Sequence, residues 1–275
     1  MIPAKFDYSR VATVDEALAL LAEHGDEAKL LAGGHSLLPL MKLRLATPAM
    51  LVDIGRLRDL SYVRADDGHV AIGALTRHRD LETSDVLQAE APLLSYTASL
   101  VGDPQVRHRG TLGGSLVHGD PASDLPAAVL AMNGTMVIAG SGGARREVPA
   151  TEFFQGFLET AVQPDEMLVE IRIPSAKGKG WSYQKFNRRA QDWAIVAAAY
   201  QEGAGVALVN MASVPVRASA VEAALASGAA VEDASASADE GLDPPSDLNA
   251  SPEYRRHLAR VLTRRAIEEA STRQS

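Results

Sequence analysis

The hydrophobic positions of this chain fall into short blocks, and the period within each block predicts a mixture of helices and strands. Residues 13–25 carry leucine and alanine at helical spacing. Thr13 is a suitable N-cap for this helix, and Glu16 completes a capping box. Apolar runs at 29–32 and 51–54 predict two buried strands. The N-terminal part is therefore expected to form a small α/β unit.

In the middle of the chain the hydrophobic positions show both the helical and the strand period. The apolar runs predict strands at 70–73, 135–138 and 168–173, a helical region over 79–101, and further helices at 121–132 and 152–158. Glycine-rich turns separate several of these blocks. We therefore expect a second and larger unit that again contains both helices and strands.

A glycine- and lysine-rich segment at 175–180 predicts a hinge before the last part of the chain. Beyond it we expect strands at 181–186, 194–200 and 206–212, and helices at 216–226 and 252–270. Residues 227–250 carry six acidic and no basic side chains, which predicts a solvated loop. The predicted fold class is α+β, with domains at 1–57, 58–175 and 176–275.

Composition restricts the classes of function. A net charge of −8 gives no reason to expect binding to nucleic acid or to an anionic membrane. The chain has no cysteine, which excludes disulfides, thiolate zinc sites and cysteine-ligated iron–sulfur clusters within it. No signal peptide and no transmembrane run are visible, so we expect a cytoplasmic protein.

Two glycine pairs indicate a ligand. Gly33 and Gly34 precede His35 and Ser36, and a second pair at 113–114 precedes another serine. Adjacent glycines let backbone N–H groups converge on one point, as a phosphate oxygen requires. Either pair alone is also explained by an ordinary turn. The two together predict a site for the two phosphates of a dinucleotide, although neither matches a Walker A or a G-x-G-x-x-G pattern.

Further candidates follow the second glycine pair. Asp120 is expected to cap the next helix, whereas Asp124 stands one turn later and suits either a structural or a ligand-binding role. Residues 185–193 form either a solvated basic turn or a set of cations that approaches an anionic cofactor. No histidine pair has metal-ligand spacing, so we assign no metal site and no catalytic residue.

Taken together, these motifs resemble those of one known family. They are Ala32-Gly33-Gly34-His35-Ser36-Leu37-Leu38-Pro39, Arg109-Gly110-Thr111-Leu112-Gly113-Gly114-Ser115, Gly119-Asp120-Pro121-Ala122-Ser123-Asp124 and Tyr183-Gln184-Lys185-Phe186. The set resembles the FAD-binding medium subunit of the molybdenum hydroxylases, of the carbon monoxide dehydrogenase and xanthine dehydrogenase types. The likeness extends over nearly the whole chain.

The resemblance implies a vanillyl-alcohol-oxidase type of FAD-binding fold, in two subdomains, followed by a C-terminal α+β domain. It also implies FAD as the cofactor, with the pyrophosphate held by the two glycine segments. The implied cofactor-binding positions are Ala32, Gly33, Gly34, His35, Ser36, Val101, Thr111, Gly113, Gly114, Ser115, Asp124, Leu168 and Lys185. At Ser115 the family commonly has asparagine, so a polar side chain is kept but its contact is altered.

The resemblance further implies the partners. These are a large subunit that carries the molybdenum cofactor and a small subunit that carries two [2Fe–2S] clusters, in a dimer of heterotrimers. The FAD-carrying chain would pass electrons from those clusters to a terminal acceptor, and the absence of cysteine fits that role. Two alternatives stay open: a stand-alone flavin-dependent oxidoreductase of the same fold, and a scaffold that has lost its cofactor.

Overall fold

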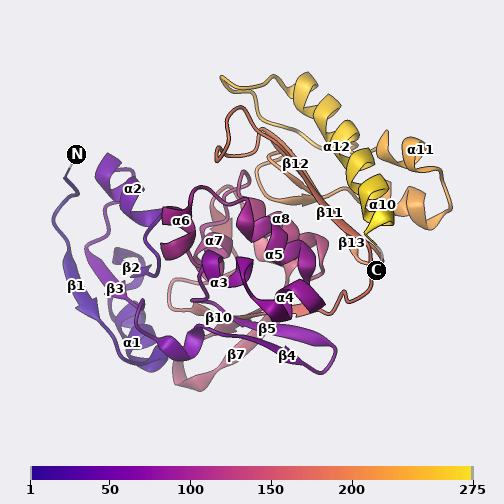
Figure 1. The fold of residues 1–275 in the computed structure, drawn as a ribbon. Coiled ribbons are helices and arrows are strands. Elements are labelled where there is room, and N and C mark those ends of the chain that lie inside the picture. Colours follow the sequence, from indigo (N-terminus) through magenta and orange to yellow (C-terminus); the bar gives the residue numbers. More distant parts are fainter. Residues whose placement is uncertain (1, 274–275) are drawn as a thin grey trace.

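The structure is a computed structural model that describes residues 2–273, so the outermost ends of the first and last predicted domains, residues 1 and 274–275, lie outside it. Three sheets of three to five strands follow one another along the described chain, each with its own helices, and a two-stranded hairpin adds a fourth sheet (Figure 1). Both helices and strands are present in every part, as the α+β prediction requires. That fold class is confirmed.

The N-terminal unit is built on a parallel sheet in the order β1-β3-β2. Its elements are β1 (Asp7–Arg10), α1 (Val14–His24), β2 (Ala28–Leu31), α2 (Leu37–Leu43) and β3 (Met50–Asp53). The capping prediction for α1 is confirmed, because the Thr13 side chain accepts from the Glu16 amide at 3.1 Å. The Glu16 carboxylate accepts from the amide of Ala12 at 2.7 Å. The first helix therefore starts where its sequence directs it to.

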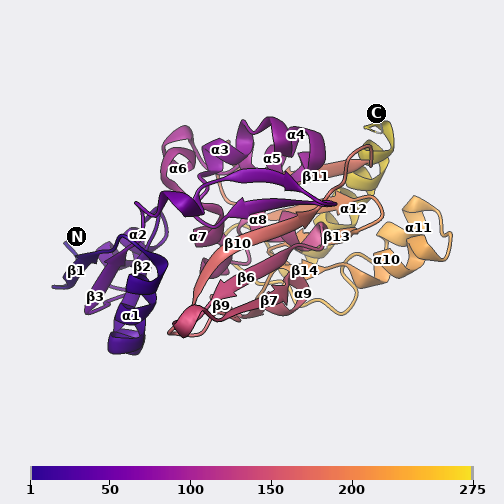
Figure 2. The same cartoon turned by 90° about the horizontal axis from the view of Figure 1, so that it is seen from below.

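The middle sheet is antiparallel, with strand order β4-β5-β10-β6-β7. Its strands are β4 (Val63–Asp66), β5 (His69–Gly73), β6 (Thr135–Ala139), β7 (Arg145–Pro149) and β10 (Met167–Pro174). Alternate residues of β6 pack into different hydrophobic cores, because successive side chains of a strand point to opposite faces of the sheet. Met136 and Ile138 pack with the helices of this unit, whereas Val137 and Ala139 pack with the N-terminal unit. Figure 2 shows the N-terminal unit beside one end of this sheet.

Short helices cover the other face of the middle sheet. They are α3 (His78–Glu82), α4 (Asp85–Glu90), α5 (Pro92–Ser99), α6 (Pro104–Arg109), α7 (Leu112–His118) and α8 (Asp124–Ala131). The prediction of one helical region over 79–101 was too simple. Ser84 caps a new helix, and Pro92 starts another, because proline has no amide hydrogen and therefore fits a first turn.

The C-terminal sheet lies between two layers of helices (Figure 1). Its strands pair in the antiparallel order β11 (Trp181–Phe186), β12 (Val196–Gln201), β13 (Gly205–Val209) and β14 (Val216–Arg217). Helices α5 and α8 contact one face, whereas α10 (Ser219–Ala226) and α12 (Pro252–Thr272) contact the other. Ala197 and Ala199 of β12 belong to the same hydrophobic core as the middle unit. The last two parts of the chain therefore share a core.

Two local predictions were wrong. The helix expected at 152–158 stops early, because α9 (Ala150–Phe153) gives way to a hairpin of β8 (Phe154–Gly156) and β9 (Glu159–Thr160). Leu158 takes a positive φ of 58° in that hairpin. Asp120 was expected to cap α8, but Ser123 occupies the N-cap position. The Asp120 carboxylate instead accepts from the amide of Ala122 at 2.8 Å.

The acidic segment 227–250 was expected to be a solvated loop, and this was only partly right, because most of it is irregular and exposed but a short part is folded. It contains α11 (Val231–Ser235), with Ala234 and Ala238 in the core against α12. Its acidic side chains meet the basic ones of α12: Arg260 binds Asp239 through Nε–Oδ1 at 2.6 Å and Nη2–Oδ2 at 2.8 Å. The charges that neutralise the segment lie later in the chain, so the local sequence does not reveal them. Three single-turn 3₁₀ helices, η1 (Gly25–Glu27), η2 (Arg58–Leu60) and η3 (Ser141–Gly143), complete the elements.

Candidate functional site

One large cavity, of about 1130 Å³, lies where the three parts of the chain meet. All thirteen positions that the sequence predicts for cofactor binding line it. They come from the turn between β2 and α2, the segment between α5 and α8, strand β10 and strand β11. Ligand sites of proteins are concave and commonly lie between structural units. The predicted residues, far apart in the sequence, therefore converge on one candidate site.

The first glycine segment offers free hydrogen-bond donors to this cavity. Within residues 2–273, the backbone amides of Gly33, Gly34, His35 and Ser36 donate no hydrogen bond. Gly34 has a φ of 78°, which glycine adopts without strain. Consecutive unpartnered amides in a turn form a concave site for anions. This segment therefore fits a diphosphate group.

Gly33 is also required for a reason that the sequence does not show. A Cβ atom at this position would stand 2.3 Å from the carbonyl oxygen of Arg109 and 3.0 Å from the Cα of Gly110. The backbone before the second glycine pair thus packs directly on the first pair. The absence of a side chain at Gly33 therefore lets the backbone of Arg109 and Gly110 approach the first glycine segment closely.

The second glycine segment is arranged differently. It forms the first turn of α7, and its amides are donated within the chain. Gly113 N–H donates to the Ala74 carbonyl at 2.8 Å, Gly114 N–H to Thr111 Oγ1 at 3.2 Å, and Ser115 N–H to the Thr111 carbonyl at 3.0 Å. The Ser115 hydroxyl, in contrast, makes no hydrogen bond with the described part of the chain and lines the cavity. This segment offers a side chain where the first segment offers amides.

A buried ion pair crosses from the middle unit to the C-terminal sheet at the cavity wall. Lys185 Nζ lies 2.8 Å from Asp124 Oδ2, and the two side chains are 8% and 7% exposed. The Tyr183 hydroxyl donates to the other carboxylate oxygen at 2.6 Å. Lys185 also donates to the carbonyl of Leu100 at 3.3 Å. The two predicted residues Asp124 and Lys185 are therefore each other's partners.

Burial governs the protonation of this group. It raises the pKa of the Asp124 carboxyl, and the nearby Lys185 ammonium opposes that rise. Burial and the adjacent carboxylate raise the pKa of the Tyr183 hydroxyl well above its usual value. Tyr183 therefore remains a hydrogen-bond donor to Asp124 at neutral pH.

Leu168 and Val101 are the two large apolar side chains among the predicted positions. Leu168 belongs to β10, next to an irregularity in its pairing with β6, and is 4% exposed. Val101 lies in the turn between α5 and α6, and both residues line the cavity. Both therefore contribute apolar surface to the cavity wall.

Sequence reasoning missed His78, the first residue of α3. It lines the cavity, is 5% exposed, and its Nδ1 has no hydrogen-bond partner in the described chain. Burial, with smaller contributions from His35, Arg77 and Arg107, lowers its pKa to about 4. The imidazole is therefore neutral at physiological pH. In the sequence His78 is an isolated histidine in a polar stretch, and no pattern there indicates that its side chain is buried beside the cavity.

The side chains of the basic segment at 185–193 differ in their exposure to solvent. Lys185 is buried, whereas the Arg189 side chain is 71% exposed and binds Asp192 through Nε–Oδ2 at 3.0 Å. Arg189, Asp192 and Trp193, which is 58% exposed, also line the cavity. The cation that reaches the interior is the lysine.

Residues 2–273 offer neither a cluster of metal ligands nor a membrane-spanning helix. No group of three or more His, Cys, Asp or Glu side chains there is arranged to hold a metal ion. Within the same residues, no helix combines the length and the apolar character that crossing a membrane demands.

Comparison with known proteins connects this cavity to a family. The FAD-binding domain of molybdopterin dehydrogenases matches residues 4–176, and the C-terminal domain of the carbon monoxide dehydrogenase flavoprotein matches residues 181–270. The chain is 41% identical over 286 residues to the carbon monoxide dehydrogenase medium chain of Hydrogenophaga pseudoflava, with 99% of each chain covered. It is 35% identical over 283 residues to the glyceraldehyde dehydrogenase medium chain of Sulfolobus acidocaldarius, covering 98% of this chain and 100% of that one.

A solved structure agrees with these relatives. The structure of carbon monoxide dehydrogenase from Hydrogenophaga pseudoflava, in a form that lacks the Mo-pyranopterin moiety of its molybdenum cofactor, contains a chain that matches with a TM-score of 0.95. The two chains are 42% identical, and all of each is covered. The family resemblance, the fold and FAD as the cofactor, all expected from the sequence motifs, are thereby confirmed. The chain belongs to the family of FAD-binding medium chains of molybdopterin dehydrogenases, which are flavoprotein subunits of oxidoreductases.

Proposed function

We propose that this chain holds FAD in the large cavity and serves as the electron-transfer subunit of a molybdenum hydroxylase complex. In that role it stands between the [2Fe–2S] clusters of a partner subunit and a terminal electron acceptor. The observation that carries the proposal is the convergence of all thirteen predicted positions on one cavity. Its wall includes a row of unpartnered amides at 33–36, which suits the diphosphate.

The chain's residues would hold the cofactor in distinct ways. The amides of Gly33 to Ser36 would bind the diphosphate oxygens, and the Ser115 hydroxyl would add a donor from the adjacent segment. Asp124 and Lys185, fixed by their mutual ion pair, would present polar groups to the flavin side. Val101 and Leu168 would supply apolar wall.

When bound, FAD supplies the capacity to accept and release electrons singly or in pairs. The chain itself binds and orients the cofactor and sets the charge around it. Lys185 keeps a cation within the buried wall, and its bond to Asp124 keeps that cation fixed. His78 adds a neutral side chain rather than a second charge, because its pKa is about 4.

The partners in this proposal are a large subunit with the molybdenum cofactor and a small [2Fe–2S] subunit, in a dimer of heterotrimers. Support comes from relatives that are themselves named as medium chains of dehydrogenases. We also propose three domains, at 1–57, 58–175 and 176–275, since a separate sheet falls within each range. A cytoplasmic location stays a prediction.

Purification with the accompanying chains tests this function. The complex is expected to show a flavin spectrum, to release FAD on denaturation, and to contain two other chains, of which one carries iron and acid-labile sulfide. A colourless chain that takes up no FAD, alone or with its partners, would contradict the proposal. Recovery of a flavin-loaded chain that is active without partners would favour the stand-alone oxidoreductase instead. The mass of the intact complex tests the stoichiometry.

A further inference from the structure

The turn between α5 and α6 forms part of the cavity wall. Val101, Gly102, Asp103 and Val106 line the cavity here. Gly102 has a φ of 46°, and a Cβ atom at this position would meet the Cβ of Val106 at 3.1 Å. The wall is thus a tight turn whose position has to be maintained by neighbouring side chains.

Two cationic side chains hold the three successive carbonyls of this turn. Lys185 Nζ donates to the Leu100 carbonyl at 3.3 Å. Arg107 Nη1 donates to the carbonyls of Val101 and Gly102, at 3.1 Å and 3.3 Å. Cations are favoured at this place, because the C-terminus of α5 carries the negative end of the helix dipole. Lys185 was predicted from the sequence, but Arg107 was not.

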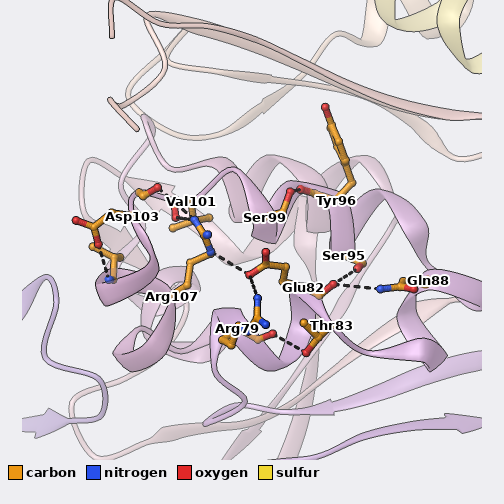
Figure 3. Close-up of polar contacts among 12 residues, drawn as sticks. Arg79, Glu82, Thr83, Gln88, Ser95, Tyr96, Ser99, Val101, Asp103 and Arg107 are labelled. Atoms are coloured by element: carbon orange, nitrogen blue, oxygen red, sulfur yellow. Dashed lines mark hydrogen bonds and ion pairs between the residues drawn. The ribbon is translucent and has the colours of Figure 1, made fainter. Parts of the chain in front are cut away.

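Arg107 is itself fixed on its other side by Glu82, the last residue of α3 (Figure 3). Arg107 Nε lies 3.0 Å from Glu82 Oε2, and the two side chains are 14% and 19% exposed. The backbone carbonyl of Glu82 accepts from Ser95 Oγ at 3.1 Å and from Gln88 Nε2 at 3.3 Å. Glu82, whose carboxylate anchors Arg107, is therefore itself held by hydrogen bonds from α4 and α5.

We propose that Arg107, anchored by Glu82, is a positioning residue that sets the cavity wall at 101–106 for FAD. This inference rests on the proposed function, in which FAD occupies the cavity. The planar guanidinium binds the carboxylate through one nitrogen and the two carbonyls through another. A lysine ammonium at the end of a flexible chain lacks this forked geometry, so it cannot replace both sets of bonds at once.

The chain provides a matched control. Arg79 binds the same carboxylate oxygen, Glu82 Oε2, through Nη1 at 3.3 Å. Its side chain is 58% exposed, and its guanidinium makes no hydrogen bond to residues 100–106 in the described structure. Figure 3 shows Arg79 and Arg107 approaching Glu82 from different sides. Removal of Arg79 changes the charge near Glu82 but leaves the turn held.

The experiment compares Arg107→Gln, Arg107→Lys and Arg79→Gln with the wild type, each as the full chain in the complex with which it co-purifies. FAD is removed and titrated back, and its binding is followed by the quenching of flavin fluorescence. The circular dichroism of the bound flavin is recorded at saturation. We expect Arg107→Gln to weaken FAD binding about tenfold, as loss of charge-assisted hydrogen bonds predicts. We also expect it to alter the flavin dichroism, whereas Arg79→Gln alters neither quantity.

A role in general stability alone would not move the dichroism of saturated flavin. FAD affinity of Arg107→Gln within about twofold of the wild type would overturn the inference, as would an equal loss in Arg79→Gln. If Arg107→Gln fails to fold, Arg107→Lys decides: weakened binding with altered dichroism supports the role, and unchanged values overturn it. Wild-type protein without affinity for FAD would overturn the proposed function as well, so the two failures are distinguishable.

Discussion

The two glycine segments look alike in the sequence, but the structure uses them in opposite ways. At 33–36 the backbone amides have no partner within the described residues, and the segment is an open turn. At 113–115 the amides are donated to Ala74 and Thr111, and the segment begins a helix. Only the first segment resembles an anion nest. A glycine pair thus indicates close approach of backbone, but not which atoms approach.

The contacts of Gly33 and Gly113 lead to the same conclusion, that each glycine permits a close approach of other backbone. A Cβ atom at Gly33 would stand 2.3 Å from the Arg109 carbonyl oxygen, and one at Gly113 would stand 2.7 Å from the Cβ and the carbonyl oxygen of Ala74. In both segments the glycine accommodates other parts of this chain. The Gly33 contact also brings the first segment against the backbone just before the second, and both segments line the same cavity.

The largest effect is expected at Gly33. In Gly33→Ala the methyl group would meet the Arg109 carbonyl, so we expect a loss of about 3 kcal/mol in the free energy of unfolding and a strong loss of bound FAD. Denaturant unfolding and flavin content after purification measure both. Gly140→Ala is the control, since its added methyl group meets only ordinary contacts at 3.9 Å and beyond. Equal behaviour of the two variants would contradict the close packing of the glycine segments.

The next effect depends on pH and concerns His78, which packs beside Gly110. Its pKa is about 4 in the folded protein and near 6.5 when unfolded, so the unfolded state binds more protons between these values. The free energy of unfolding is therefore expected to fall by about 3 kcal/mol as the pH drops from 6.5 to 4. In His78→Gln this part of the pH dependence should vanish. Identical slopes for variant and wild type would show that the histidine is not buried neutral.

A smaller effect is expected at Thr111, which caps the helix that contains the second glycine segment. Thr111→Val removes the hydroxyl that accepts from the Gly114 amide, and the loss of such an N-cap costs about 1 kcal/mol. Thermal or denaturant unfolding of the variant checks this value. Thr111→Ser, which keeps the hydroxyl, should remain close to the wild type. If both substitutions were neutral, α7 would not depend on this cap.

The smallest effect on stability is expected at Ser115. Its hydroxyl has no partner within residues 2–273, so Ser115→Ala should change the free energy of unfolding by no more than about 0.5 kcal/mol. FAD affinity should nevertheless fall, because the second segment offers the cofactor this side chain instead of amides. A titration with FAD measures the loss. Unchanged affinity would leave the first segment as the principal binder of the diphosphate.

Local features of the fold could be predicted from the sequence, because their determinants lie within a few residues. Thr13 and Glu16 mark the start of α1, and the strand expected at 181–186 is β11. The cavity residues were found through whole motifs whose combination is specific to a family. Their convergence on one cavity could not be derived from spacing alone.

The features that were missed depend on partners far away in the chain. Asp239 is neutralised by Arg260, so an acidic stretch that reads as a loop is folded against α12. Arg107 is defined by Glu82, and His78 by its burial against Gly110. In each case the physical cause is a contact between segments, and no local period or composition reports it.

The bond between Asp124 and Lys185 has a consequence for how the protein matures. It joins residues 61 positions apart and closes the cavity wall with a strand of the C-terminal sheet. During synthesis, both glycine segments leave the ribosome before that strand exists. The complete cavity wall therefore forms only after the last part of the chain has been made and has docked, and a product truncated before β11 would lack it.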